Sequence, residues 1–432
     1  MAETASRARN IEQSPVQRTF RRGRLDPGDS IKQPQARVPV NPTANPLFSG
    51  WSLPSEQANF AKGFPLMSRI PFIEARFFSP EDTTYSLEKR FVQHLRDLRS
   101  RKLPDTSAGA EGEDSGERAA RRRHSTSPSE QDRARIKRRV DLLLERRKAA
   151  SGMGHLSREH RERLSVFRDG VRLVAIATEH LADELAAELH GEMPWMAPAT
   201  EAVWHAMRRS VREGWPGLRL PPMLLDGPPG IGKSHWARRL GQLLTVPTAV
   251  VEATSENASF GVVGSQRGWG SAYPGRVLET ILQAGVANPI LVVDEVEKAG
   301  KATSNKGHTF GLAEALLPLL EPMTAKRWNC PYYQVKFDMS WVGWVLTSNN
   351  YRLLPEPLLS RCPPVRLREL TRAELSDFVR REGAKRHLSS IAVQVVTEAV
   401  DRTCQYGMRI DLRIASRLLQ RAEDLERRPV CH

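Results

Sequence analysis

The chain has few cysteines and lacks any long apolar run. Its 432 residues include four cysteines, and Cys330, Cys362, Cys404 and Cys431 stand too far apart to form a C-x-x-C pair. This spacing indicates neither a zinc site nor a disulfide framework, so a reducing compartment is the simpler interpretation. There is no N-terminal h-region and no run of eighteen apolar residues. We therefore expect a cytoplasmic protein with no membrane partner.

Acidic residues are outnumbered, with 50 Asp and Glu against 65 Lys and Arg, which gives a formal charge of +15. Such an excess favours contact with nucleic acid, an anionic membrane or an acidic partner. The first 150 residues hold about +10 of this charge. The folded remainder is therefore a poor candidate for a nucleic-acid reader, and nucleic acid stays an open partner only through the basic N-terminal tail.

Residues 1–150 are predicted to be a largely disordered basic tail with short helices. Up to about residue 50 the composition is too polar to bury the surface that ordering requires. Apolar residues return in bursts over 51–103, which favours a linker with one short helix at 86–99 over a segment that docks on a partner. Helical spacing predicts a basic helix at 133–150, and such a helix could contact nucleic acid, a partner or only solvent.

The rest of the chain has the pattern of an α/β protein. Residues 151–217 have helical spacing and are expected to form an N-terminal helical element, while 369–432 read as three helices of an all-α lid domain. Between them, over 218–368, four short apolar runs alternate with helical stretches, at 223–225, 249–251, 290–293 and 342–346. This alternation predicts a nucleotide-binding domain built on a buried parallel sheet with helices on both faces.

One stretch between the first strand and the next helix has the spacing G-x-x-x-x-G-K-S. It consists of Gly227, Pro228, Pro229, Gly230, Ile231, Gly232, Lys233 and Ser234. Glycines allow a turn whose backbone N–H groups and following helix N-terminus attract phosphate oxygens. Lys233 would reach the β- and γ-phosphates, and the Ser234 hydroxyl would be a ligand of Mg²⁺. An ordinary glycine-rich turn is the competing interpretation, which the flanking strand and helix make the weaker one.

A second group of polar residues follows later strands of the predicted sheet. Asp294 and Glu295 end the run at 290–293, beside the phosphate loop, where Asp294 would hold Mg²⁺ and Glu295 would polarise the attacking water. The alternative is a simple acidic cap of the next helix. Asn349 follows the strand at 342–346 and, ahead of Asn350, is expected to hold the water or the γ-phosphate. Arg361 could act on the nucleotide of a neighbouring subunit, or could be a surface arginine with a structural partner.

Residues 194–421 resemble the ATPase module of the AAA+ superfamily, and most closely that of the Lon proteases. The matching blocks occur in the same order with similar gaps, at 261–275, 288–289, 294–295, 313–322, 335–340, 347–349 and 357–361. The resemblance covers about half of the chain. It implies an AAA+ P-loop αβα sandwich with a C-terminal lid, and ATP and Mg²⁺ as ligands.

The resemblance also implies a homo-oligomeric ring, usually of six subunits, that threads a protein substrate through its pore during ATP turnover. The family's pore-loop aromatic matches Trp269, with Tyr273 as a second candidate, although a Trp buried in a glycine-rich turn is the alternative. The family's lid arginine matches Arg409, with Arg413 as the fallback, and it would contact the γ-phosphate.

Lon proteases carry a Ser-Lys peptidase domain after the lid, whereas this sequence ends at His432. Their N-terminal substrate domain is not recognisable either. We therefore expect an ATP-hydrolysing, protein-remodelling ring without its own peptidase. Two alternatives stay open: a nucleic-acid-associated ATPase that uses the basic tail, and an ATPase partner of a separately encoded peptidase.

Overall fold

The computed structural model describes residues 68–102, 124–254, 258–267, 272–299, 302–303 and 309–428. All of them belong to one compact unit, Leu53–His432. The predicted disorder before residue 50 and the pore-loop candidate Trp269 lie outside the described residues. No helix in the described ranges is long and apolar enough to cross a bilayer.

A parallel five-stranded sheet forms the centre of the α/β domain, in the order β11-β3-β10-β5-β4. Its strands are β3 (Met223–Asp226), β4 (Thr248–Glu252), β5 (Ile290–Asp294), β10 (Gly343–Ser348) and β11 (Pro364–Arg366). Four of them coincide with the predicted runs. The fifth, β11, begins with a proline, which lacks an N–H for the ladder and is tolerated at a sheet edge.

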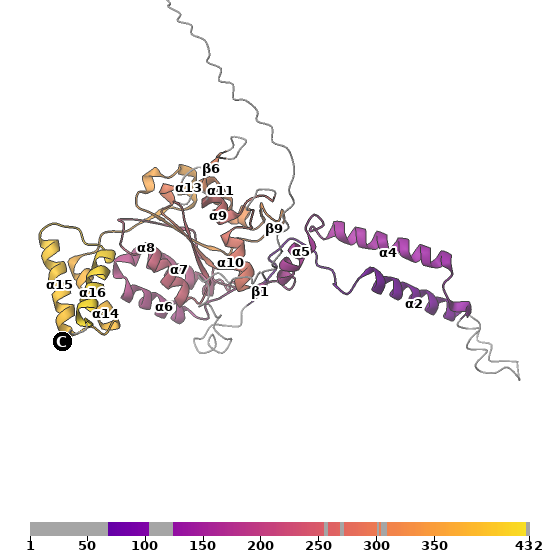
Figure 1. Ribbon diagram of the computed structural model, residues 1–432, viewed down its shortest axis with the longest axis horizontal. Helices are drawn as coiled ribbons and strands as arrows, with labels where there is room; N and C mark the ends of the chain where they lie inside the picture. The colour runs from indigo at the N-terminus through magenta and orange to yellow at the C-terminus, as the bar shows by residue number, and fades with distance from the viewer. Residues whose placement is uncertain are drawn as a thin grey trace, which may run out of the picture. The chain divides into compact units, whose positions relative to one another are not determined.

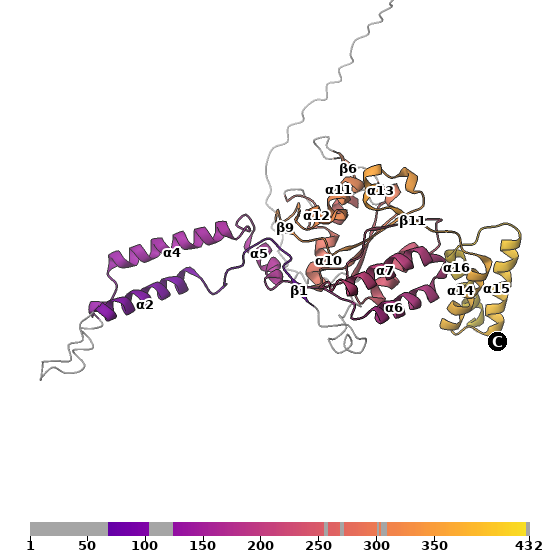
Figure 2. The ribbon, with the colours of Figure 1, turned by 180° about the vertical axis from the view of Figure 1, so that it is seen from behind.

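Alternate residues of the strands face two separate apolar cores, as the period of two of a β-strand requires. Leu224 and Leu346 belong to one core, while Leu225 and Val345 belong to the other. The first core includes α9 (Ala258–Val263), α10 (Arg276–Ala284) and α11 (Leu312–Leu320). The second includes α6 (Glu179–Glu192), α7 (Ala197–Arg212) and α8 (Lys233–Leu243), and Figures 1 and 2 show helices on both faces of the sheet. The predicted αβα sandwich is thus confirmed.

Three C-terminal helices form the predicted lid. They are α14 (Arg372–Lys385), α15 (Ser390–Gln405) and α16 (Leu412–Glu426), and they enclose a small core of their own. Each begins at a side-chain cap: Thr371 for α14, Ser389 for α15 and Asp411 for α16. Such caps accept hydrogen bonds from the otherwise unpaired N–H groups of the first helical turn.

The segment before the α/β domain is more ordered than the sequence predicts. Helices α2 (Thr84–Lys102) and α4 (Glu130–Ala150) pack against each other, and Asp82 pairs with Arg147 of α4 at 2.8 Å. Phe72, only 1% exposed, lies in the sheet's first core. The linker interpretation of residues 51–103 therefore does not fit residues 68–102, although the one helix predicted there, at 86–99, is present as α2.

The remaining elements are short. They are the helices α5 (Arg158–Leu164), α12 (Pro322–Ala325) and α13 (Glu356–Arg361), and the two-residue strands β1 (Arg69–Ile70), β2 (Val171–Arg172), β6 (Ala302–Thr303), β7 (Thr309–Phe310), β8 (Trp328–Asn329) and β9 (Lys336–Phe337). The pairs β1–β2, β6–β7 and β8–β9 are antiparallel.

Candidate active site

The predicted phosphate loop connects β3 to α8 at the carboxyl edge of the sheet. Gly230 and Gly232 have φ angles of +75° and +94°, which glycine adopts without the steric penalty of a Cβ. Gly232 is the N-cap of α8, so the loop ends at a helix N-terminus that can attract an anion. The indole N–H of Trp195 donates to the Ile231 carbonyl at 2.8 Å and fixes the loop from the helical element.

Lys233 begins α8 and is 7% exposed. Its ammonium group donates to the carbonyls of Gly227 (2.7 Å) and Pro228 (3.0 Å) and to Asn349 Oδ1 (2.9 Å). Burial lowers the pKa of Lys233, while four nearby carboxylates oppose this shift: Asp294, Glu297, Asp226 and Glu295. The hydrogen-bond acceptors of this ammonium among the described residues are all uncharged, so a phosphate that enters the pocket could form a direct ion pair with it.

The two predicted metal ligands are in contact. The Ser234 hydroxyl donates to Asp294 Oδ1 at 2.8 Å, and the Thr347 hydroxyl donates to the same oxygen. Within the described ranges no group of three His, Cys, Asp or Glu residues could hold a metal ion by itself. A hydroxyl and one carboxylate nevertheless fit Mg²⁺, which commonly takes one or two protein oxygens and completes its shell with phosphate oxygens and water.

Glu295 adopts a left-handed backbone conformation, with φ 54° and ψ 48°. A non-glycine residue in this region is uncommon and is a pointer to function where the surrounding structure maintains it. The Glu295 N–H donates to the Thr347 hydroxyl at 3.0 Å, and the carboxylate binds Lys298 at 2.9 Å. The strand end and the following turn thus set the direction of this carboxylate.

Asn349 joins the phosphate loop to Glu295. Its Oδ1 accepts from Lys233, and its Nδ2 donates to Glu295 Oε1 at 3.2 Å. The backbone N–H of Asn349 donates to Glu297 Oε1 at 3.0 Å, whereas Oε2 of this glutamate is buried and has no hydrogen-bond partner among the described residues. Asn350, the weaker alternative, caps a short turn through its contact with the Arg352 N–H instead.

A pocket of about 590 Å³ combines the loop, the strand ends and the lid. Lys233, Asp294 and Asn349 line it from the α/β domain, and Phe378 and Arg413 line it from the lid. The lid also touches the loop directly, because the Leu412 N–H donates to the Gly230 carbonyl at 3.1 Å. Among the predicted phosphate and metal ligands, this cavity is lined by Pro229, Gly230, Gly232, Lys233, Ser234 and Asp294, whereas Gly227, Pro228 and Ile231 are not among its lining residues.

The predicted arginines lie in different places. Arg413, the fallback lid arginine, lines the pocket, whereas Arg409 is 86% exposed on its side chain, pairs with Glu369 at 2.9 Å and is not among the lining residues. Arg361 also lies outside this pocket, where its guanidinium donates to the Pro357 carbonyl at 3.0 Å and stands 3.6 Å from Glu321.

Tyr273, the second pore-loop candidate, is 43% exposed and lines a separate hollow beside Gly261 and the edge strand β4. The sequence analysis missed several contributors to the nucleotide pocket and its surroundings, and two of them are Thr347 and Glu297. Thr347 precedes the predicted Asn349 by two residues, and Glu297 follows Glu295 by two, so proximity to a predicted residue was the signal available for both.

Comparison with known proteins agrees with this geometry. Residues 223–370 match the family model "ATPase family associated with various cellular activities (AAA)". Lon protease 2 of Thermus thermophilus is 32% identical over 183 residues, which are 41% of this chain and 22% of that protein. The Lon protease of Mycoplasma pneumoniae is 30% identical over 177 residues (41% and 22%), and the peroxisomal Lon protease homolog 2 of Spinacia oleracea is 29% identical over 196 residues (44% and 22%).

The chain spans about a fifth of the length of these curated relatives. The predicted relationship to the AAA ATPases and to Lon is confirmed at the level of this domain. The chain carries an ATPase domain of the AAA family, with relatives among the Lon proteases.

Proposed function

We propose that this chain hydrolyses MgATP and that, as a ring of identical subunits, it uses this hydrolysis to remodel a protein substrate. The observation that carries the hydrolysis is the convergence of Lys233, Ser234, Asp294, Glu295 and Asn349 on one pocket. A binding site alone would need only the loop and its lysine. The added carboxylates and the amide are the groups that metal binding and water activation require.

Each residue has a separate task in this proposal. Lys233 binds the β- and γ-phosphates, and Ser234 and Asp294 hold Mg²⁺, which would neutralise charge that develops on the phosphate oxygens. Glu295 takes the proton of the attacking water. Asn349 donates a hydrogen bond from its Nδ2 to the Glu295 carboxylate and so keeps this carboxylate beside the phosphate loop. The distance between the base and the phosphates is thereby fixed.

The ring rests on the family relationship and on the position of Arg361. Its side chain is 35% exposed and is not among the lining residues of its own chain's pocket, as expected for an arginine that acts on a neighbour's nucleotide. Arg413 is the lid arginine that the pocket favours for the γ-phosphate. We propose six subunits, with Trp269 and Tyr273 as the residues that grip the threaded chain.

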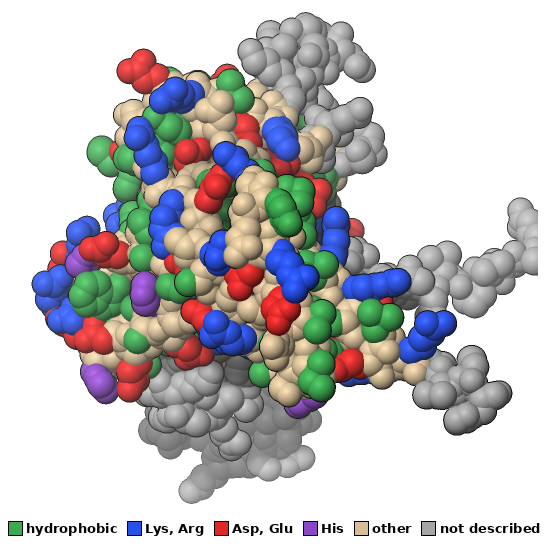
Figure 3. Space-filling model, turned by 90° about the vertical axis from the view of Figure 1, so that its left-hand side faces the viewer, with side chains coloured by type: hydrophobic (Ala, Val, Ile, Leu, Met, Phe, Trp, Pro, Cys, Tyr) green, Lys and Arg blue, Asp and Glu red, His purple; other side chains and the backbone are tan. Residues whose placement is uncertain are grey.

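Nucleic-acid binding is the second candidate, and one observation favours it. Four arginines of α4 are exposed and have no acidic partner among the described residues: Arg135, Arg138, Arg139 and Arg146. The side of the molecule that carries the lid shows Lys, Arg, Asp and Glu interspersed instead (Figure 3). Replacing the four arginines by Gln in the full chain should remove salt-sensitive DNA binding if α4 carries it. Truncation is a poorer test, because it would remove Phe72 from the core.

The remodelling proposal is tested with a folded fluorescent reporter that bears an unstructured tail. The full chain with MgATP should extinguish the fluorescence, and light scattering should give the mass of six subunits. Trp269→Ala or Tyr273→Ala should slow unfolding without slowing ATP hydrolysis. A protein that hydrolyses ATP as a monomer would contradict the ring, and unfolding that proceeds without ATP would contradict the coupling. If a separately encoded peptidase is the partner, it should co-purify with the assembled protein from native extract.

A further inference from the structure

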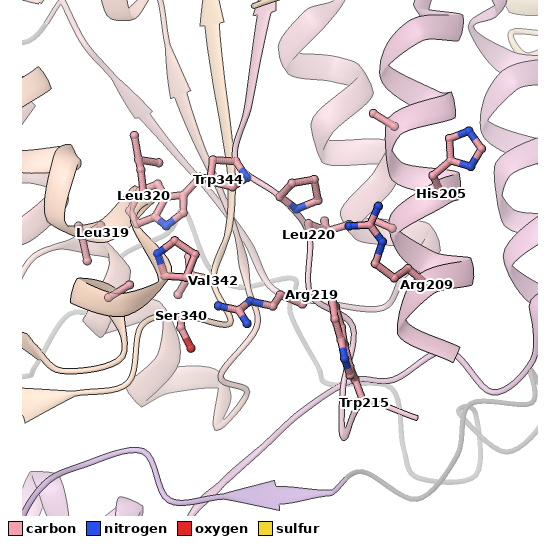
Figure 4. Close-up of a pocket in the computed structure, with 16 residues that line it drawn as sticks. His205, Arg209, Trp215, Arg219, Leu220, Leu319, Leu320, Ser340, Val342 and Trp344 are labelled. Atoms are coloured by element: carbon pink, nitrogen blue, oxygen red, sulfur yellow. The ribbon is translucent and has the colours of Figure 1, made fainter. Parts of the chain in front are cut away.

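A second cavity, of about 300 Å³, lies at the edge of the sheet where the strands begin, opposite the nucleotide pocket. Leu220 and Pro222 lead into β3 at this edge, and Val342 leads into β10. Helix α7 forms one wall, while Leu320 at the end of α11 contributes to the other (Figure 4). None of the described residues that line this cavity also lines the nucleotide pocket.

One side chain in the wall of this cavity carries a polar group that has no partner in the described part of the chain. Trp344 is 1% exposed, and its indole N–H is buried without a hydrogen bond among the described residues. Figure 4 shows the ring beside Leu319 and Leu320, whose side chains cannot accept a hydrogen bond. Since nearly all buried polar groups in folded proteins are hydrogen-bonded, an unpaired donor that lines a cavity points to a ligand that brings an acceptor.

Two cationic side chains line the same cavity. Arg209 of α7 and Arg219 before β3 have no acidic partner among the described residues, and Arg219 lies 5.7 Å from the centre of the Trp341 ring. Their neighbour Arg208 differs, because it pairs with Asp183 at 2.8 Å. Figure 4 shows the Arg219 guanidinium reaching toward Ser340 and Val342. The cavity therefore offers positive charge at its rim and apolar walls inside.

We propose that this cavity binds an N-acylated apolar α-amino acid that ends in a free carboxylate. The carboxylate would accept hydrogen bonds from Arg219 and Arg209, since charge-assisted pairs of this kind are the strong ones. The acyl carbonyl would accept from Trp344, and the apolar side chain would lie against Leu320 and Val342. A free small molecule and the C-terminal residue of a polypeptide share this chemistry.

The test is calorimetric titration of the full chain with N-acetyl-L-leucine and, separately, with N-acetyl-L-leucinamide, which lacks the carboxylate. The acid should bind saturably. The affinity for the amide should be at least about tenfold lower. Arg219→Gln should lower the affinity for the acid about tenfold and leave the affinity for the amide unchanged. The matched control is Arg212→Gln, because Arg212 lies on α7, pairs with Glu179 and does not line the cavity. This control should bind both compounds as the unaltered chain does.

A second variant keeps the proposal decisive if Arg219→Gln is poorly folded. Trp344→Phe removes the N–H and should lower the affinities for the acid and for the amide by similar factors. The thermal transition of this variant, measured alongside, reports whether it is folded. An N-acetylated peptide that ends in the same leucine separates the sources: tighter binding than the free acid identifies a polypeptide, and weaker binding identifies a small molecule. Equal affinity for acid and amide, no saturable binding up to about 10 mM, or binding that vanishes as the chain self-associates would each overturn the proposal.

Discussion

Replacing Thr347 by Val should damage both the stability of the protein and its ATP hydrolysis. Thr347 is fully buried, and its hydroxyl donates to Asp294 and accepts from the Glu295 N–H at 3.0 Å. Valine keeps the shape but removes the hydroxyl that pairs with this part-buried N–H and with Asp294, which should cost about 1–3 kcal/mol of unfolding free energy. Because Glu295 has a left-handed backbone, a lost contact at its N–H should also shift the carboxylate, and kcat should fall roughly 100-fold for a displacement of about 1 Å.

Denaturant unfolding gives the first quantity, and steady-state hydrolysis with saturating MgATP gives the second. Thr347→Ser is the matched control, since it keeps the hydroxyl and loses one methyl group at about 1 kcal/mol. It should retain most of the activity. The reasoning is refuted if the valine variant turns over ATP at the normal rate, or if serine and valine impair the protein equally.

Three further outcomes follow from the lid and its contact with the loop. Gly230→Ala places a Cβ about 2.1 Å from the carboxylate oxygen of Asp411 in the lid, so ATP should bind at least about tenfold more weakly. The control is Gly214→Ala, because Gly214 also has a positive φ, +61°, but a Cβ there would meet no described residue within 4 Å. It should change only the stability, by about 1 kcal/mol in a melting experiment. Arg413→Ala should slow ATP hydrolysis in a steady-state assay more than Arg409→Ala does. The reverse order would identify Arg409, the match to the family's lid arginine, as the residue that contacts the γ-phosphate. Hydrogen bonding to an arginine lowers the pKa of Glu374 from 4.5 to about 2, so Glu374→Gln should reduce the unfolding free energy at pH 7 by about 1 kcal/mol. This difference should be constant above about pH 4.5 and disappear as the pH falls through about 2, and a difference that persists there would contradict the assignment.

The chemistry of the phosphate and metal ligands could be predicted because it is local. The spacing from Gly227 to Ser234 places a loop directly before a helix that begins at Lys233, all within eight residues. Asp294 and Glu295 follow an apolar strand, and parallel strands end at the same edge of a sheet. These two facts are enough to place the residues together without knowledge of the rest of the fold.

The lid arginine could not be chosen from the sequence because its position depends on where α16 begins. That helix starts at Leu412, so Arg413 is in its first turn, near the contact between the Leu412 N–H and the Gly230 carbonyl. Arg409 precedes the helix and pairs with Glu369 instead. A shift of one helical turn separates a residue that lines the pocket from one that does not.

Short strands escaped prediction for a different reason. The two-residue strands β1 and β2 have no periodicity to detect, and they are held by pairing with each other across about 100 residues. Phe72, two residues after β1, lies in the core, and its carbonyl accepts a hydrogen bond from the Asp338 N–H at 2.8 Å. The order of residues 68–77 is therefore set by tertiary contacts, which a composition that looks like a linker does not reveal.

The central claim is that Glu295 activates water in a site assembled by Lys233, Ser234 and Asp294. The most direct measurement is the rate of MgATP hydrolysis by full-length Glu295→Gln, together with its affinity for ATP. The account predicts that turnover falls at least about 100-fold, while the affinity stays within about threefold because the loop and the metal ligands are intact. Hydrolysis at the normal rate by a folded Glu295→Gln protein would contradict it.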